Sequence, residues 1–143
     1  MAEIILLVGG VMKKSSEQDL FMNYKKRILW PLSIVECKGE KEFKQAFEKH
    51  QQKSPFWIML DETGENLTSL AFSSFLQSSL EKHQKVGFMI GIDTGIPKEI
   101  KEHVRHKISF GKQTWPHLIA RILLIEQLYR AQQILNNHPY HKI

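Results

Sequence analysis

Short runs of apolar, β-favouring residues alternate along the chain with longer segments in which apolar residues recur every three or four positions. Such runs are typical of strands, and such segments are typical of helices with one buried face. The sequence predicts strands at 3–8, 32–35, 56–60, 86–90 and 107–110, and helices at 16–29, 41–52, 68–83, from near Pro97, and at 116–135. This alternation is typical of an α/β fold, so we expect a single domain over residues 1–143, with a mainly parallel sheet and helices on both faces.

The last predicted helix, 116–135, differs from the others because apolar residues surround most of its circumference. A helix of this kind is buried on more than one side. In a domain of this size the sheet can cover one side, and a second subunit could cover another, which predicts a homodimer with twofold symmetry. A central core helix in a monomer is the alternative.

Charge and cysteine content narrow the choice of partner and compartment. Lys and Arg number 20 against 15 Asp and Glu, and the net charge of +5 favours a polyanion such as RNA, although an ordinary basic protein would show the same excess. The single cysteine, Cys37, excludes an internal disulfide and fits a reducing, cytoplasmic setting, and we expect it to be structural.

The apolar run at 3–8 is too short to span a membrane and lacks the flanks of a signal peptide, so we expect no membrane association.

Loops that contain glycine follow three of the predicted strands, at residues 61–64, 91–96 and 111–115. In an open parallel sheet, ligands bind at the carboxyl ends of the strands, and glycine lets the backbone approach a ligand closely. Backbone groups in these loops could hold an adenine and a ribose, so the sequence predicts a small-molecule site there. No Cys/His zinc pattern, phosphate-binding loop or nucleophile elbow accompanies the loops, and we expect no metal.

Two pairs of polar residues lie one helical turn apart on the last helix. His117 and Arg121 share one face, and Glu126 and Arg130 share the opposite face. The second pair has the spacing of a helix-stabilising ion pair. It could be purely structural, or it could reach a site across a dimer interface, and the spacing does not distinguish these alternatives.

The C-terminal segment is rich in polar and aromatic residues, where a chain end usually tolerates almost any sequence. It reads Leu128-Tyr129-Arg130-Ala131, then Ile134, then Asn137-His138-Pro139-Tyr140-His141. Four motifs precede it, namely Tyr24-Lys25-Lys26-Arg27, Leu60-Asp61-x-x-Gly64, Gly91 with Gly95, and Pro116-His117 with Arg121. Together these motifs, which span nearly the whole chain, resemble the ribosomal RNA large subunit methyltransferase H family of small SPOUT-class enzymes.

The resemblance implies a SPOUT fold with a deep trefoil knot near the C-terminus, a homodimer, and S-adenosylmethionine bound in the knotted loops. It also implies methylation at N3 of a pseudouridine in large-subunit (23S) ribosomal RNA, and we expect the assembled ribosome to be the substrate. By position, the cofactor contacts would be Leu60, Gly91, Gly95, Phe110, Gly111, Lys112, Gln113, Thr114 and Trp115.

For the chemistry, the resemblance and the residue types point to His117, Arg121, Arg130, Tyr140 and His141. A neutral histidine can accept the proton of a uracil-type ring nitrogen, arginines can stabilise negative charge on the ring carbonyls, and Tyr140 can stack on a base. Ile92 stands where the family usually has a second glycine, which leaves open an RNA-binding protein that no longer transfers methyl groups. A methyltransferase for another RNA, such as tRNA, is the other alternative.

Overall fold

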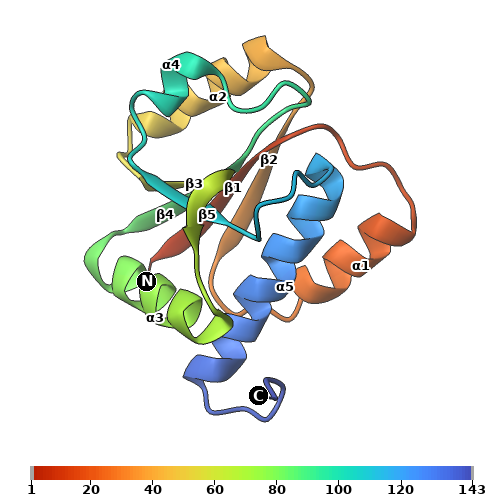
Figure 1. The fold of residues 1–143 in the computed structure, drawn as a ribbon, viewed down its shortest axis with the longest axis vertical. Helices are drawn as coiled ribbons and strands as arrows, with labels where there is room; N and C mark the ends of the chain where they lie inside the picture. Colours follow the sequence, from red (N-terminus) through yellow and green to blue (C-terminus); the bar gives the residue numbers. More distant parts are fainter. Residues whose placement is uncertain (1, 143) are drawn as a thin grey trace.

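A single parallel sheet forms the centre of the computed structural model, which describes residues 2–142 (Figure 1). Its strands are β1 (Glu3–Gly9), β2 (Leu32–Cys37), β3 (Phe56–Asn66), β4 (Lys85–Ile90) and β5 (His106–Ser109). They lie in the order β2-β1-β4-β3-β5, and every neighbouring pair is parallel. Almost every residue of β1 and β4 is buried, as expected of central strands that are covered on both faces. The predicted α/β class and parallel sheet are confirmed.

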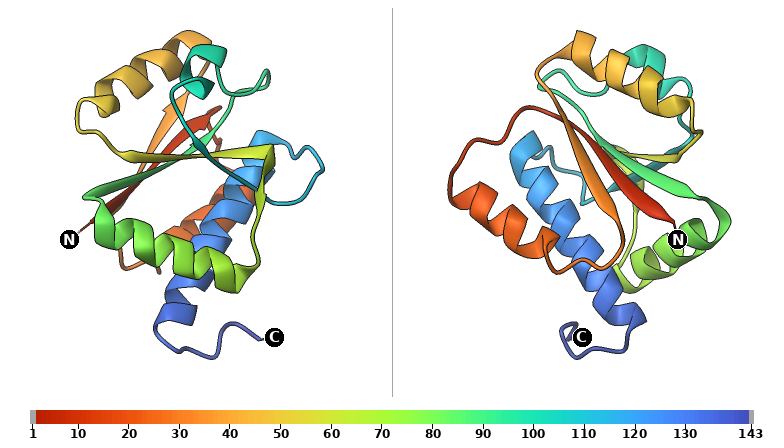
Figure 2. Two further views of the ribbon diagram at one scale, coloured as in Figure 1. Left: turned by 60° about the vertical axis from the view of Figure 1, so that its left-hand side comes forward. Right: turned by 180° about the vertical axis from the view of Figure 1, so that it is seen from behind.

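Helices cover both faces of this sheet, as the sequence predicted (Figures 1 and 2). They are α1 (Ser16–Lys25), α2 (Glu40–Gln51), α3 (Ser69–Lys82), α4 (Lys98–Lys101) and α5 (His117–Leu135). One apolar cluster joins α1, α3 and α5 to one face, and a second joins α2 and α4 to the other. Cys37 is buried in the second cluster, where burial raises the pKa of its thiol to about 11, so this thiol is structural.

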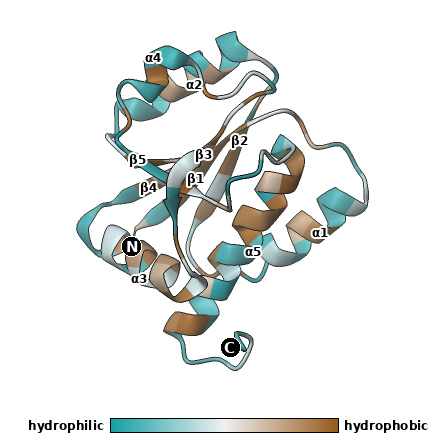
Figure 3. Ribbon diagram, in the orientation of Figure 1, coloured by the Kyte–Doolittle hydropathy of each residue, from teal (hydrophilic) through white to brown (hydrophobic). Residues whose placement is uncertain are grey.

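Helix α5 packs on the sheet with α1 on one flank and α3 on the other (Figure 1). Leu124, Ile125 and Leu128 are fully buried, and hydrophobic residues run along much of the helix (Figure 3). Neighbours within the same chain therefore cover most of its apolar circumference. Apolar surface remains exposed near its start, at Trp115 and Ile119. The homodimer stays a prediction.

The ends of the helices differ from the prediction where distant residues intervene. Helix α1 ends at Lys25, and not at residue 29, because Gln132 of α5 binds the segment that follows. The Gln132 side-chain oxygen accepts a hydrogen bond from the Leu29 N–H (2.6 Å), and its amide nitrogen donates to the Arg27 carbonyl (3.0 Å). The Leu29 N–H thus bonds to a distant side chain and not within the helix, and the Arg27 carbonyl has no helical donor because residue 31 is proline.

Strand β3 continues well beyond the predicted end at residue 60. Leu60 and Glu65 both pair with Ile108 of β5, so residues 61–64 leave the sheet and return to the same partner. At Gly64 a Cβ atom would lie 2.7 Å from the backbone of Ile108, which explains the glycine. The residues expected to form a loop after β3 are therefore a bulge within it.

Two further expectations concern the chain as a whole. Within residues 2–142, no helix combines the length and apolar character that crossing a membrane requires. The trefoil knot stays a prediction, since strand order alone does not define how loops thread past one another.

Candidate active site

Three loops at the carboxyl edge of the sheet enclose a cavity of about 900 Å³. Because all the strands are parallel, their carboxyl ends meet at this edge. The cavity has the size of a cofactor site. Of the predicted cofactor residues, it is lined by Leu60, Gly91, Gly95, Phe110, Gly111, Gln113, Thr114 and Trp115, whereas Lys112 is not among the lining residues.

The loop after β4 is a tight turn that requires glycine at positions 91 and 95. The Gly95 N–H donates to the Ile92 carbonyl (2.7 Å), and Gly95 has a φ of +93°. A Cβ atom at Gly91 would lie 2.5 Å from the Gly95 carbonyl carbon and the Ile96 nitrogen. Ile92 does not have a positive φ, and its side chain packs against the apolar cluster beneath α2. An isoleucine is thus compatible with this backbone.

The loop after β5 is fixed by side-chain hydrogen bonds at two points. Thr114 Oγ1 donates to Glu62 Oε2 across the cavity mouth (2.5 Å), and Trp115 Nε1 donates to the Phe110 carbonyl (3.1 Å). Gly111, with a φ of +103°, provides the turn between them. The first bond joins the β5 loop to the bulge of β3, and the second closes the loop on itself.

Charged groups of both signs line the cavity. Lys101 Nζ lies 3.5 Å from Asp61 Oδ2, and Lys107 Nζ donates to Thr63 Oγ1 (3.2 Å). Burial raises the pKa of Asp61, but hydrogen bonds from Thr63 and the charge of Lys101 outweigh this effect and lower it overall. Asp61 is therefore ionised at neutral pH. Such a lining suits a ligand that carries both a positive and a negative group.

His117, the first residue of α5, lies at the rim of the cavity. Its Nδ1 atom is 3.1 Å from Asp93 Oδ1, and its ring packs on Gly10. A carboxylate beside Nδ1 favours the tautomer that is protonated there, which leaves Nε2 as a proton acceptor. Gly10 has a φ of +86°, and a Cβ atom there would lie 2.5 Å from Nε2. Gly10 thus packs on one side of the ring, and Asp93, whose side chain is 89% exposed, faces the other.

Arg121 points into the interior and not into the cavity; its side chain is only 1% exposed. Nη1 donates to Glu36 Oε2 (2.6 Å), and Nη2 donates to the carbonyls of Gly9 (3.2 Å) and Gly10 (3.0 Å). Among the residues described, its Nε has no hydrogen-bond partner. These contacts support a positioning role for Arg121 and leave it no route to a substrate.

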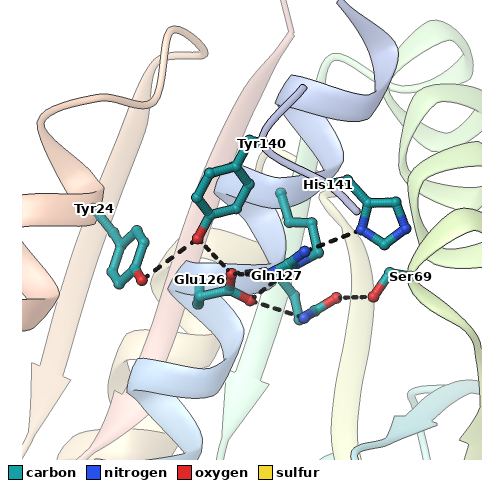
Figure 4. A network of polar contacts seen from close by, with 7 residues as sticks. Tyr24, Ser69, Glu126, Gln127, Tyr140 and His141 are labelled. Carbon is teal, nitrogen blue, oxygen red and sulfur yellow. Dashed lines mark hydrogen bonds and ion pairs between the residues drawn. The ribbon is translucent and has the colours of Figure 1, made fainter. Parts of the chain in front are cut away.

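A second polar cluster lies at the other end of α5 and contains the remaining predicted residues (Figure 4). Glu126 Oε2 accepts hydrogen bonds from Arg130 Nη2 (2.8 Å) and from the Tyr140 hydroxyl (2.8 Å). Arg130 Nη1 lies 3.0 Å from His141 Nδ1, and the Arg130 guanidinium stacks 4.8 Å from the centre of the Tyr140 ring. The Tyr140 hydroxyl also reaches that of Tyr24 on α1 (3.5 Å). We call these residues, Tyr24, Glu126, Arg130, Tyr140 and His141, the tail cluster.

The tail cluster raises the pKa of two of its members, Arg130 and Tyr140. The hydrogen bond and charge of Glu126 raise the pKa of Arg130. Burial, with hydrogen bonds to Tyr24 and Glu126, raises the pKa of Tyr140 far above its usual value. Arg130 is thus a cation and Tyr140 a neutral hydroxyl at neutral pH. The spacing of Glu126 and Arg130 was compatible with a purely structural ion pair or with a contact across a dimer interface. In the structure this pair is the centre of a network that holds the C-terminal tail on α5.

The structure brings the predicted residues together in two groups and not in one. His117 and Arg130 stand at opposite ends of α5, which separates them by roughly 20 Å at 1.5 Å per residue. Sequence reasoning did not select Asp93, Gly10 or Glu36 as members of the site. The glycine pair after β1 was the available signal for Gly10, but no spacing relates Glu36 to Arg121, which is 85 positions away.

Comparison with known proteins agrees with this arrangement. A family model described as "Predicted SPOUT methyltransferase" matches residues 1–141. A protein from Synechococcus sp. named "Ribosomal RNA large subunit methyltransferase H" is 42% identical over 140 residues, covering 96% of this chain and 94% of the relative. A protein of the same name from Protochlamydia amoebophila is 39% identical over 143 residues, covering 99% of this chain and all of the relative. The chain therefore belongs to the SPOUT methyltransferases, within the ribosomal RNA large subunit methyltransferase H family.

Solved structures of low sequence identity share the fold. An AdoMet-bound rRNA methyltransferase from Sinorhizobium meliloti superposes with a TM-score of 0.54 at 10% identity, covering 93% of this chain and 57% of that one. The SpoU methyltransferase AviRb from Streptomyces viridochromogenes, in complex with AdoMet, gives 0.53 at 12% identity, with 93% and 58% covered. These similarities support the SPOUT fold and no finer conclusion.

Proposed function

We propose that the protein uses S-adenosylmethionine to methylate N3 of a pseudouridine in 23S ribosomal RNA, acting as a cytoplasmic homodimer on the assembled ribosome. The observation that carries this proposal is the cavity at the carboxyl edge of the sheet, with His117 at its rim. The curated relatives bear the name of large-subunit ribosomal RNA methyltransferases, and the net charge of +5 favours an RNA substrate.

The residues that line the cavity fit S-adenosylmethionine. Leu60, Phe110 and Ile90 provide apolar surface for an adenine, and Gly91 and Gly95 leave the backbone free to approach it. The carboxylates of Asp61 and Asp93 favour a cationic ligand, and Lys101 can attract its carboxylate. When bound, S-adenosylmethionine supplies an electrophilic methyl group on its sulfonium.

His117 is our candidate for the group that accepts the proton of the ring nitrogen. Its Nδ1 faces Asp93, so the free lone pair is at Nε2, and the carboxylate stabilises the imidazolium that forms on proton transfer. Proton acceptance of this kind contributes about 10²- to 10⁴-fold to a rate. Arg121 acts indirectly, by holding the Gly9–Gly10 turn beside the imidazole.

The tail cluster offers an arginine, a tyrosine and a histidine to the RNA. Arg130 can stabilise negative charge on a uracil carbonyl, and Tyr140 and His141 can contact a base. Because Arg130 is roughly 20 Å along α5 from His117 of the same chain, these two residues are too far apart to contact the same base within one subunit. A twofold dimer in which the tail cluster of one subunit approaches the cavity of the other removes this difficulty.

Mass mapping of ribosomal RNA from cells that lack the protein tests the function directly. We expect the loss of one methyl group from a pseudouridine of the 23S RNA, and its return when purified protein and S-adenosylmethionine are added to ribosomes from those cells. Loss of a methyl group from tRNA instead would assign the enzyme to another substrate. Unchanged RNA, together with no calorimetric binding of S-adenosylmethionine, would leave an RNA-binding protein without transferase activity.

A further inference from the structure

Glu36, near the end of β2, lies outside the cavity but begins a series of contacts that ends on His117. Its Oε2 atom accepts two hydrogen bonds, from the Met12 N–H (2.8 Å) and from Arg121 Nη1 (2.6 Å). The Glu36 side chain is 31% exposed, whereas that of Arg121 is 1% exposed. A buried guanidinium needs an adjacent carboxylate to compensate its charge, so Glu36 keeps Arg121 in this position.

Arg121 transmits this constraint to the Gly9–Gly10 turn at the end of β1. Its Nη2 atom donates to both carbonyls of the turn, at 3.2 Å and 3.0 Å. Glu36 fixes the same segment from its other end, through the Met12 N–H. The backbone from residue 9 to residue 12 is therefore held by one carboxylate and one guanidinium, together with the hydrogen bond from the Gly10 N–H to the Cys37 carbonyl (2.7 Å).

The Gly9–Gly10 turn packs against two parts of the candidate active site, the loop after β4 and the His117 ring. A Cβ atom at Gly9 would lie 2.6 Å from the Gly91 carbonyl oxygen and the Ile92 nitrogen, and one at Gly10 would lie 2.5 Å from His117 Nε2. Asp93 contacts the opposite edge of the same imidazole at Nδ1. With this close packing, a shift of the turn at Gly10 moves the His117 ring.

We propose that Glu36 is a positioning residue for methyl transfer, which acts through Arg121 and the Gly9–Gly10 turn to hold His117 Nε2 in place. This inference rests on the proposed function, because it gives His117 a proton to accept. A displacement of about 1 Å at a reacting group costs about a hundredfold in rate. Loss of Glu36 is therefore expected to act on kcat and to leave the affinity for S-adenosylmethionine nearly unchanged.

Steady-state methylation of ribosomes that lack the modification, with labelled S-adenosylmethionine, tests this role. We expect Glu36→Ala to lower kcat by about a hundredfold and to change the KM for S-adenosylmethionine less than about threefold. Glu36→Gln keeps an oxygen that both donors can reach, so it should restore most of the rate. Glu81→Gln, which removes an exposed carboxylate on α3, serves as the matched control and should behave as wild type.

A purely structural Glu36 would lower the Tm and leave the kcat of the folded protein unchanged, and that result would overturn the proposal. If Glu36→Ala does not fold, Arg121→Lys decides the question, because an amine cannot reach Glu36 and both carbonyls at once. We expect it to lower kcat by at least about tenfold at an unchanged KM, and a wild-type rate would again overturn the proposal.

The ring-nitrogen NMR shifts of His117 provide a readout that does not depend on activity. In wild type, we expect a single tautomer protonated at Nδ1, and in Glu36→Ala a mixture of tautomers or a changed Nε2 shift. Unchanged shifts in a folded Glu36→Ala protein would contradict the positioning role. If the wild-type protein methylates no RNA but the His117 shifts still change in Glu36→Ala, the proposed function is wrong. The structural link from Glu36 to His117 would then still be supported.

Discussion

The two ends of α5 carry two sites that are built in different ways. At its start, glycine turns and backbone groups enclose a cavity, and His117 at its rim is our candidate proton acceptor. At its end, the tail cluster is made of side chains alone, with Glu126 at its centre. A backbone cavity suits a small molecule of fixed shape, whereas half-buried charged and aromatic side chains at the surface suit contact with RNA. One helix thus separates the cofactor cavity from the predicted RNA contacts within the chain.

The turn at Gly91 in the cavity wall should not tolerate an added side chain. We expect Gly91→Val to abolish detectable calorimetric binding of S-adenosylmethionine, because the new side chain would meet the backbone of Gly95 and Ile96 at 2.5 Å. Gly39→Ala is the matched control, since nothing lies within 4 Å of a Cβ atom there, and it should bind normally. Normal binding by Gly91→Val would show that the cofactor does not use this loop.

Mixing two inactive variants tests whether the two ends of α5 work together across subunits. We expect His117→Ala and Arg130→Ala each to lower activity by about a hundredfold or more. Random reassociation should restore about a quarter of the wild-type rate, because half of the dimers are mixed and each mixed dimer has one intact site.

The control for this experiment pairs His117→Ala with Asp93→Ala, both at the cavity. Each site of such a mixed dimer would contain a damaged cavity, so we expect no recovery. If the His117→Ala and Arg130→Ala mixture also shows none, the two ends do not combine in trans.

The tail cluster should contribute measurably to stability through its carboxylate. We expect Tyr140→Phe to lower the free energy of unfolding by about 1 kcal/mol, because Glu126 loses a hydrogen-bond donor at 2.8 Å. Tyr24→Phe removes a longer contact of 3.5 Å and should cost less than half as much. Urea unfolding monitored by circular dichroism measures both, and equal losses would contradict the central role given to Glu126.

The smallest expected effect concerns Asp61 in the cavity wall. Because the folded state lowers the pKa of Asp61, its ionised form stabilises the fold above the ordinary aspartate pKa of about 4, and this contribution is lost as pH falls below that value. We expect Asp61→Asn to cost up to about 1 kcal/mol at pH 7, and we expect this cost to fall toward zero as the pH falls through the lowered folded-state pKa. The exposed Glu65→Gln is the control in the same urea titrations. A loss that is independent of pH would mean that Asp61 acts through packing.

The sequence was sufficient for the sheet, the helices and the cavity because each depends on local patterns. The apolar runs placed the strands, and parallel pairing then brought Leu60, Gly91 and Gly111 to one edge. The end of α1 and the bonding of Glu36 to Arg121 depend on residues far apart in the chain, and no periodicity connects such residues. The separation of His117 from Arg130 follows from helix length alone and could have been anticipated.

The pairing of strand β3 with β5 determines where the chain can gain or lose residues. It pairs with Ile108 at Leu60, leaves the sheet, and pairs with Ile108 again at Glu65. Since the strand re-enters at the same rung, residues can be added to or removed from 61–63 without shifting the register of the sheet on either side. The length of the segment 61–63, which lines the cavity, can therefore vary without altering the pairing of β3 with β5. Insertions at this position are the natural route for reshaping ligand preference while the core stays intact.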